Sequence, residues 1–280
     1  MRLGGGIEKQ YNNPDEWVSL AKELRYSAVL CPIDSHSDSA TRKAYLQAAK
    51  KADLLIGETG VWKNTLSIND SERKAAMNYA KEQLALADEM GANCCVNIIG
   101  SRNLQNWDGF CAENYSSDFY SLAVDSIQEI IDAVKPMHTF YTIEPMPWLV
   151  PDSPEQYLKL IKDVDRKEFA VHLDFVNMIN CPERYCKSTE FIQHCFDLLG
   201  PYIKSIHGKD VLMEQAYTTL IHETMPGKGS LDYKKILAMV EKLGQDIPLF
   251  VEHLPDFETY RCAANYVRNQ AERAGIVVKG

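Results

Sequence analysis

Residues 140–174 read FYTIEPMPWLVPDSPEQYLKLIKDVDRKEFAVHLD, and this stretch has the pattern of a strand, a helix and a second strand. Phe140–Ile143 and Phe169–Leu173 are short aliphatic or aromatic runs of the length of a buried strand. Between them, Ser153-Pro154-Glu155 is typical of a helix N-terminus, and the apolar spacing extends the predicted helix to Val164. A strand, a helix and a strand in this order indicate two parallel strands joined by a crossover helix.

The same unit recurs along the whole chain. Further strands are expected at Arg2–Ile7, Ser27–Ile33, Asp53–Ile56, Asn93–Ile99, Ile203–Ile206 and Leu249–Val251. Further helices are expected at Pro14–Leu24, Ala40–Ala52, Ser71–Met90 with Gly91 as its C-cap, Tyr120–Val134, Thr189–Leu199, Leu231–Leu243 and Tyr260–Ala274. Eight such units in 280 residues, with no linker rich in Pro, Gly or Ser, predict one domain over residues 1–280 with the fold of a closed (β/α)8 TIM barrel. The competing doubly wound sheet lacks its GxGxxG signature, because Gly4-Gly5-Gly6 is only a glycine run.

Composition excludes several classes of protein. The chain has 30 Lys and Arg against 39 Asp and Glu, a formal net charge of −9, and 45% hydrophobic residues, which excludes a disordered or collagen-like chain. The acidic balance argues against a nucleic-acid partner or an anionic membrane. No apolar run reaches the roughly 18 residues of a membrane helix, and the N-terminus lacks the apolar segment of a secretory signal. The eight cysteines are scattered with no CxxC pair, so we expect reduced thiols and a cytoplasmic location.

A residue able to bind a metal follows each of the last four predicted strands. These residues are Glu144, Asp174, His207 and Glu252, at intervals of 30, 33 and 45 residues. The carboxyl ends of barrel strands converge and carry the chemistry of such folds, so we expect the four side chains to meet. Three carboxylates placed together repel unless a cation lies between them. Two Glu, one Asp and one His suit Mn²⁺, Mg²⁺ or Co²⁺, with Zn²⁺ as a further candidate. Taken singly, each acidic residue also fits a helix cap or a solvent-facing position, and the histidine also fits a hydrogen-bonded core residue.

Other polar and aromatic residues are predicted near the same end of the barrel. His172 precedes Asp174 by two residues, so it shares a face with Asp174 but lies deeper, as a support or a core residue. His253 is expected to point toward the helix layer. Asn97 ends a predicted strand and is a candidate for substrate contact. Trp62, Trp107 and Trp148 follow strand ends; they are candidates for the apolar wall of a sugar pocket, with loop packing or a subunit contact as the alternative.

Three segments resemble one superfamily. They are Ile143-Glu144-Pro145, His207-Gly208-Lys209-Asp210 and the glycine-containing Pro226–Tyr233. Together they are similar to the xylose-isomerase-like TIM-barrel superfamily, the sugar phosphate isomerase/epimerase group. In the ketose 3-epimerases of this superfamily the matching residues bind Mn²⁺ or Co²⁺. The resemblance implies that Glu144, Asp174, His207 and Glu252 hold one divalent ion, with Mn²⁺ as the first expectation. It also implies that Glu144 and Glu252 are the catalytic acid and base.

Two positions depart from those epimerases. Asn177 stands where they have a histidine, and Lys209-Asp210 follows the metal histidine in place of a more distant arginine. The His-x-Lys-Asp pattern is more similar to the inosose dehydratase and hydroxypyruvate isomerase branches. Asn177 and Lys209 are therefore predicted substrate contacts, and the alternative for Lys209 is a structural ion pair with Asp210.

The predicted function is a divalent-metal-dependent isomerase or epimerase that acts beside the carbonyl of a sugar or keto-polyol through an enediolate. A lyase or dehydratase on the same site is the alternative, because it shares the first proton abstraction. An endonuclease IV-like repair enzyme is disfavoured, since the earlier strand ends, at Glu58 and at Asn97–Ser101, carry no histidine. A non-catalytic sugar-binding barrel is a further alternative. We expect a small sugar or polyol as partner, without a phosphate cradle, and a homodimer or homotetramer.

Overall fold

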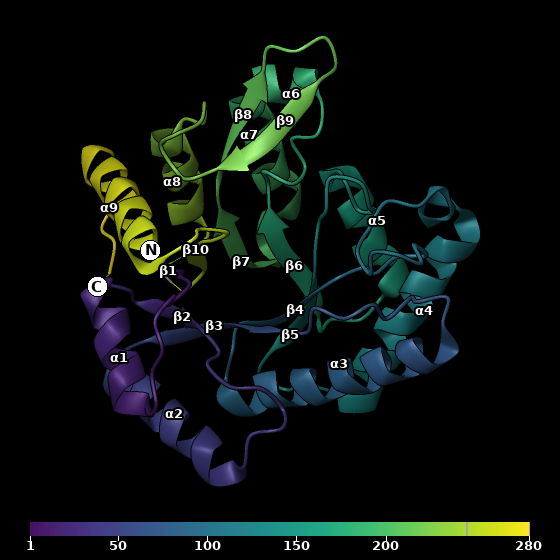
Figure 1. Cartoon of the computed structure of the whole chain (residues 1–280), viewed down its shortest axis with the longest axis horizontal. Coiled ribbons are helices and arrows are strands. Elements are labelled where there is room, and N and C mark those ends of the chain that lie inside the picture. The colour runs from purple at the N-terminus through teal and green to yellow at the C-terminus, as the bar shows by residue number, and fades with distance from the viewer. Residues whose placement is uncertain (245, 280) are drawn as a thin grey trace.

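The centre of the molecule is a ring of eight parallel strands. The structure, a computed structural model, describes residues 1–244 and 246–279. The strands are ordered β1-β10-β7-β6-β5-β4-β3-β2 around the ring (Figure 1). Their bounds are β1 Arg2–Gly5, β2 Ala28–Leu30, β3 Leu55–Gly60, β4 Cys94–Ile98, β5 Phe140–Glu144, β6 Phe169–Asp174, β7 Ile203–Gly208 and β10 Pro248–Val251. The Ser27 amide donates to Leu3 O at 3.0 Å between β2 and β1, so the ring is nearly closed and the predicted (β/α)8 TIM barrel is confirmed.

Helices follow the strands and form the outer layer (Figure 1). They are α1 Pro14–Glu23, α2 Ser39–Lys51, α3 Asp70–Met90, α4 Ser117–Val134, α5 Pro154–Val164, α6 Pro182–Cys186, α7 Ser188–Leu199, α8 Tyr233–Lys242 and α9 Phe257–Arg273, with short 3-10 turns at Ala112–Tyr115 and Gly200–Tyr202. The predicted caps are present: Ser153 accepts from the Gln156 amide, and Gly91 ends α3 at φ 64°. No helix in the described ranges combines the length and the apolar character needed to cross a bilayer.

The barrel interior consists of layers because side chains two residues apart face the same side of a strand. The lower layer holds polar side chains, which include Thr142 of β5, His172 of β6 and Ser205 of β7, all fully buried. The residues two positions further along each strand form the upper layer, at the end of the barrel where the strands stop. The sequence pattern thus places one polar layer directly beneath another.

One aromatic ring fills the barrel next to these layers. Phe250 of β10 is 1% exposed and lies against two glycines of other strands. A Cβ at Gly4 would come within 2.4 Å of the Phe250 ring, and a Cβ at Gly57 within 2.6 Å. Any larger side chain at either position would therefore displace the ring.

The structure differs from the predicted elements in two places that matter for the site. The third strand runs Leu55–Gly60 rather than 53–56, so Glu58 lies inside it. An antiparallel hairpin, β8 Asp210–Glu214 and β9 Leu220–Thr224, follows β7 where the sequence pattern predicts no element. Its signal in the sequence is two five-residue runs on either side of the polar connection 215–219.

Tyr157 of α5 gives a test of how the helix layer holds the strands beneath the site. Its buried hydroxyl accepts from the Ile143 amide at 3.1 Å and reaches the carbonyl oxygens of Ile143 and Ala170. Tyr157→Phe leaves these buried groups without that partner, so we expect the free energy of unfolding to fall by about 1–3 kcal/mol. Urea unfolding measures the change, and Tyr202→Phe at the surface is the matched control, with little expected effect. Equal losses in both variants would contradict this role of the hydroxyl.

Candidate active site

The four residues predicted as metal ligands meet at the carboxyl end of the barrel. Glu144 and Asp174 end β5 and β6, His207 lies in β7, and Glu252 directly follows β10. One ligand atom from each lies within 4.8 Å of the others, which is close enough to hold one metal ion. The strands align these positions, since Asp174 pairs with His207 and His207 pairs with Phe250 in the sheet register.

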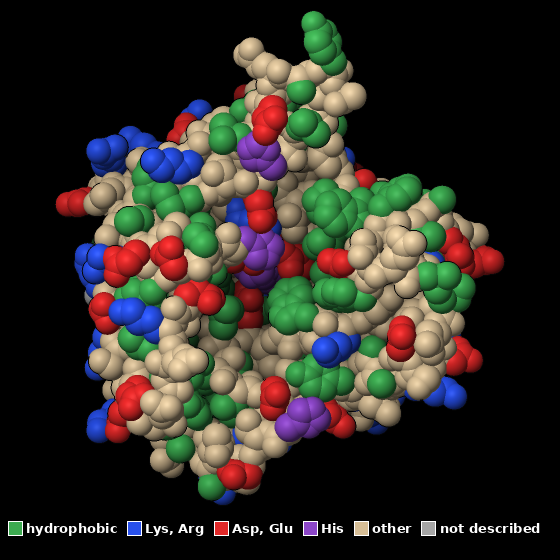
Figure 2. Space-filling view, in the orientation of Figure 1, with side chains coloured by type: hydrophobic (Ala, Val, Ile, Leu, Met, Phe, Trp, Pro, Cys, Tyr) green, Lys and Arg blue, Asp and Glu red, His purple; other side chains and the backbone are tan. Residues whose placement is uncertain are grey.

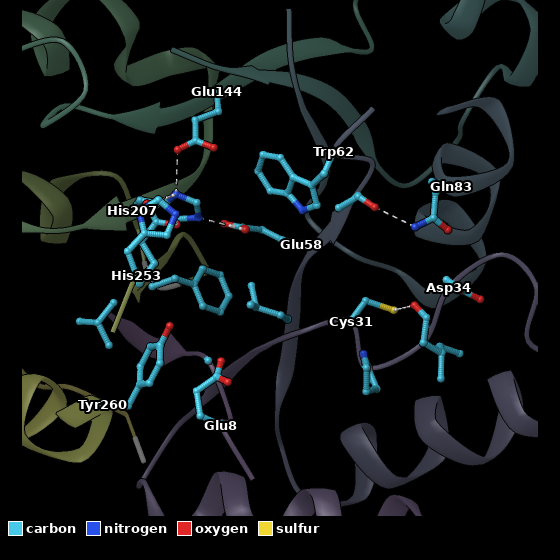
Figure 3. A pocket seen from close by; sticks show the side chains of 18 of the residues that line it. Glu8, Cys31, Asp34, Glu58, Trp62, Gln83, Glu144, His207, His253 and Tyr260 are labelled. Carbon is cyan, nitrogen blue, oxygen red and sulfur yellow. Dashed lines mark hydrogen bonds and ion pairs between the residues drawn. The ribbon is translucent and has the colours of Figure 1, made fainter. Parts of the chain in front are cut away.

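His207 presents one ring nitrogen to the carboxylates. Its Nδ1 lies 3.0 Å from Glu252 Oε1, 3.2 Å from Glu144 Oε1 and 4.0 Å from Asp174 Oδ2. The opposite nitrogen, Nε2, points toward Glu58 (Figure 3). Nδ1 is therefore the atom with which His207 would bind a metal, and Nε2 is left for a supporting hydrogen bond.

The donor set fits a divalent cation. Asp174 Oδ2 and Glu252 Oε1 are buried, and neither accepts a directed hydrogen bond within the described part of the chain. The ammonium of Lys209 lies beside both, at 2.6 Å and 2.7 Å, and forms ion pairs with them. One ammonium does not neutralise the three carboxylates of the cluster. Their remaining lone pairs, with His207 Nδ1, form the mostly oxygen set that Mg²⁺ and Mn²⁺ favour.

The pKa values in the cluster show which groups of the chain itself balance the negative charge of the carboxylates. Burial raises the pKa of Asp174 to about 6, and the nearby Glu144 and Glu252 add to this against the opposing effect of Lys209. Burial alone would lower the pKa of His207, but Glu252, Glu58 and Glu144 hold it well above its usual value. The ring is then an imidazolium with a proton on each nitrogen, and a metal ion on Nδ1 would take the place of the Nδ1 proton.

Lys209 is held inside the site rather than at its surface. It is 1% exposed, and its Nζ also lies 3.0 Å from Glu223 Oε2 and 3.2 Å from Asn177 Oδ1. The alternative pairing with Asp210 does not occur in the structure as described, because the Asp210 carboxylate faces other groups. The role of Lys209 as a direct substrate contact stays a prediction.

Asp210 instead organises the glycine-containing segment that carries the resemblance. Its carboxylate accepts from the backbone amides of Val211, Gly227 and Leu231 at 2.8, 3.0 and 3.0 Å. A Cβ at Gly229 would lie 2.2 Å from Asp210 Oδ1, so only glycine lets the chain pass this closely. This fixes the return from β9 to α8.

Glu58 is a site residue that the sequence did not reveal. It is 4% exposed, its Oε2 lies 3.3 Å from His207 Nε2, and its Oε1 lies 3.3 Å from His172 Nδ1 and accepts from Ser205 Oγ. Although burial opposes it, the two histidines hold the pKa of Glu58 below its usual value. The sequence does contain a signal for it, because Glu58 lies in an apolar run with glycines. A third strand extended to Gly60 would have placed its side chain in the barrel interior. His172 lies deeper than Asp174, as predicted, and is fully buried.

Two connected cavities open above the cluster. The first, of about 740 Å³, is lined in part by Glu144, His207 and Glu252; the second, of about 870 Å³, is lined in part by Trp148 and Asn177. Glu144, Trp62 and His253 line both, so the two cavities adjoin at these three residues. Figure 2 shows the hollow with acidic and histidine side chains inside it and hydrophobic side chains along one side.

His253 differs from its predicted place, and Asn97 supports a loop. β10 ends at Val251, and His253 adopts φ 53°, so strand alternation does not apply and the ring faces the cavities instead of the helices. Its Nδ1 lies 2.8 Å from Glu223 Oε1. Asn97 is fully buried and lines neither cavity; its side chain accepts from the Lys63 amide at 3.2 Å and donates to Lys63 O at 3.0 Å. It therefore holds the loop of Trp62, and its contact with substrate stays a prediction.

Comparison with models of protein families shows the family of this chain. The model of the xylose isomerase-like TIM barrel family matches residues 18–270. The chain belongs to this family. None of the curated proteins compared with the sequence matches it.

Solved structures of this xylose isomerase-like barrel type share the fold at low identity. A xylose isomerase-like TIM barrel protein from Mycobacterium smegmatis in complex with magnesium has a TM-score of 0.68 and 14% identity, over 97% of this chain and 92% of that one. A structure named the probable 3-DHS dehydratase AsbF, from Bacillus anthracis, has a TM-score of 0.71 and 16% identity, over 93% and 95%. D-Psicose 3-epimerase with D-tagatose, from Clostridium cellulolyticum H10, has a TM-score of 0.70 and 12% identity, over 99% and 100%.

The position of Glu58 gives a prediction about metal affinity. A carboxylate that accepts from the free nitrogen of a metal-binding histidine orients the ring and makes it more basic. Glu58→Gln keeps the shape and removes the charge, so we expect the affinity for Mn²⁺ to fall about 10- to 100-fold in isothermal titration calorimetry. Glu8→Gln is the control, because Glu8 lines the same cavity without contacting His207. An unchanged affinity in Glu58→Gln would remove Glu58 from the metal site.

Proposed function

We propose that this protein is a metal-dependent isomerase or epimerase that moves a proton beside the carbonyl of a sugar or keto-polyol, through an enediolate. The observation that carries the proposal is the meeting of Glu144, Asp174, His207 and Glu252 within 4.8 Å beneath an open cavity. Family membership supports the proposal, because it places the chain among xylose isomerase-like barrels.

In this proposal, Glu144, Asp174, His207 and Glu252 hold one divalent ion, with Mn²⁺ first and Mg²⁺, Co²⁺ and Zn²⁺ as the other candidates. Such an ion supplies electrostatic stabilisation of the negative charge that develops on the substrate oxygens. The magnesium in the M. smegmatis structure supports a divalent metal in this type of barrel.

Glu144 and Glu252 are the proposed acid and base. Although burial opposes it, His207 keeps the pKa of both carboxyls below the usual value, so both are ionised near neutral pH. Both line the first cavity, so a carbon atom held there can be approached by Glu144 from β5 and by Glu252 from the loop after β10. One takes the proton from the carbon, and the other, once protonated, returns a proton.

A dehydratase is the second candidate, and the Glu223–His253 pair favours it. The hydrogen bond to Glu223, despite burial, raises the pKa of His253, which favours the protonated ring that can donate a proton. His253 Nε2 lies 3.6 Å from Glu252 Oε2, at the border of both cavities. After proton abstraction from the same carbon, this imidazolium is placed to protonate a departing hydroxyl group.

Proton exchange in D₂O tests the reaction. We expect the Mn²⁺-loaded enzyme to place deuterium beside the carbonyl of at least one member of a keto-sugar panel. Glu252→Gln removes one acid–base group, so its exchange should be about 10²- to 10⁴-fold slower. Mass spectrometry of the product, corrected for deuterium, separates unchanged mass for isomerisation from loss of one water for dehydration.

Controls for this experiment separate the parts of the proposal. Glu272→Gln, at an exposed carboxylate that lines neither cavity, should exchange at the wild-type rate, and removal of the metal with EDTA should abolish exchange. Unchanged divalent-metal content in Glu252→Gln would exclude Glu252 as a ligand. Absence of exchange across the panel with metal bound would refute both the isomerase and the dehydratase proposals.

The cavity lining predicts an unphosphorylated substrate. None of the described residues lining either cavity is an arginine or a lysine, and the first cavity is lined by Glu8, Asp34, Glu58, Glu144 and Glu252. A phosphate would face these carboxylates, so we expect fructose 6-phosphate to bind about tenfold more weakly than fructose, or about 1.4 kcal/mol. Calorimetric titration of the Mn²⁺-loaded protein measures both affinities, and tighter binding of fructose 6-phosphate than of fructose would contradict the prediction.

The remaining expectations stay part of the proposal. The eight cysteines are free thiols in the structure, which supports a reducing compartment such as the cytoplasm. One domain over residues 1–280 and assembly into a homodimer or homotetramer stay predictions.

A further inference from the structure

We propose that the substrate is a sugar that keeps a carbonyl group, as a ring ketone or a free reducing end, and carries a second, flat ring through an O-glycosidic link. The sugar would occupy the first cavity and the attached ring the second. This inference rests on the proposed function, because it assigns the reacting carbon to the first cavity. The shared chemistry of the second unit is a flat apolar face, which an aromatic aglycone and the face of a second pyranose both provide.

The two cavities differ in chemical character. The first is lined by five carboxylates and by polar groups such as Gln83, together with apolar groups such as Leu30 and Phe250. The second is lined mainly by apolar side chains, among them Trp62, Trp107, Trp148, Met146 and Ile179. A free monosaccharide, which is polar on all its edges, matches the first cavity and leaves the second unused.

Three tryptophans in the second cavity are left partly open to solvent. Trp62, Trp107 and Trp148 are 40%, 42% and 39% exposed, whereas Trp17 in the core is 1% exposed. Large aromatic side chains gathered in one concave region mark a binding surface, because burying them against a ligand is favourable. The described lining of the second cavity includes Asp108, Glu144 and Glu223 but no lysine or arginine, and its His253 is paired with Glu223, so the second cavity does not suit an anionic group.

Two of these rings are held in place. Trp148 Nε1 donates to Asp108 O at 2.8 Å. Trp62 adopts φ 49°, a left-handed conformation that costs a non-glycine residue energy, and the Lys63 backbone next to it is held by both atoms of the Asn97 amide group. Rings fixed before binding lose little freedom when a ligand stacks on them.

The position of the junction links the second cavity to the reaction. Both cavities meet at Glu144, Trp62 and His253, so a ligand that fills both passes over the proposed acid–base carboxylate. Their volumes, about 740 and 870 Å³, each fall in the range of roughly 300–1,000 Å³ typical of small-molecule sites. The pair therefore accommodates two linked rings with the link at Glu144.

Equilibrium binding of matched glycosides tests this inference. The probes are methyl and phenyl D-glucopyranosides, galactopyranosides and mannopyranosides, as α and β anomers, with cellobiose as the two-sugar arm. We expect at least one phenyl glycoside or cellobiose to bind the Mn²⁺-loaded protein about tenfold or more tightly than the matching methyl glycoside, by calorimetry. Preference for the phenyl compound identifies an aromatic aglycone, and preference for cellobiose a second sugar.

Variants of the second cavity decide whether the gain arises there. In Trp148→Ala and in Trp107→Ala the ratio of the affinity for the two-ring probe to that for the methyl glycoside should fall to near one. The affinity for the methyl glycoside should change less than twofold. Tyr202→Ala, an exposed aromatic that lines neither cavity, should keep the full ratio. Three outcomes would overturn the inference. They are an affinity ratio near one for every pair in the wild type, no binding by any two-ring probe, and an affinity ratio that is retained in both tryptophan variants.

These outcomes are distinguishable from failure of the proposed function, because binding is measured without turnover. Loss of all deuterium exchange with a retained two-ring preference would refute the proposed reaction and leave the second subsite standing. Deuterium exchange without any two-ring preference would refute the subsite alone.

Discussion

Negative charge concentrated in a nearly dry space is the constraint on which this site depends. Glu144 and Asp174 are 5% and 0% exposed, and Glu252 completes a cluster whose ligand atoms lie within 4.8 Å. Transfer of each ion from water costs several kcal/mol, so the cluster persists only with compensating cations and hydrogen bonds. Lys209 and a protonated His207 supply two positive charges from within the chain. A divalent ion would provide the same compensation at the centre of the cluster, where it also faces the cavity.

The lower layer of the barrel determines how the upper layer can act. His207 has one nitrogen toward the carboxylates and the other toward Glu58, which also contacts His172 and Ser205. The ring is thereby held by Glu58, which in turn contacts the fully buried His172 and Ser205. Ligands held in this way need little rearrangement when a cation binds, and such preorganisation favours electrostatic catalysis. The barrel strands accordingly carry a supporting residue two positions before the functional one.

The sequence predicted the part of the site that follows from regular strand geometry. Glu144, Asp174, His207 and Glu252 were identifiable because each follows an apolar run and parallel strands end together. Glu58 was missed because the third strand continues past Gly57, a residue whose lack of a side chain accommodates Phe250 of a distant strand. His253 was placed on the wrong side because a single left-handed residue after β10 reverses the expected direction. Both errors arise from tertiary contacts and backbone conformations that hydrophobic periodicity does not encode.

The β8–β9 hairpin links the least predictable part of the chain to its chemistry. Glu223 of β9 contacts Lys209 Nζ on one side and His253 on the other, and these two residues in turn contact Glu252. A segment outside the barrel therefore contributes to the charge balance of a proposed acid–base residue and, through His253, to the border between the two cavities. The barrel strands position the candidate ligands, whereas the hairpin forms a separate two-stranded sheet that lies outside the barrel register. A change in this hairpin is thus a route by which the same barrel can accept a different substrate beside the candidate metal site.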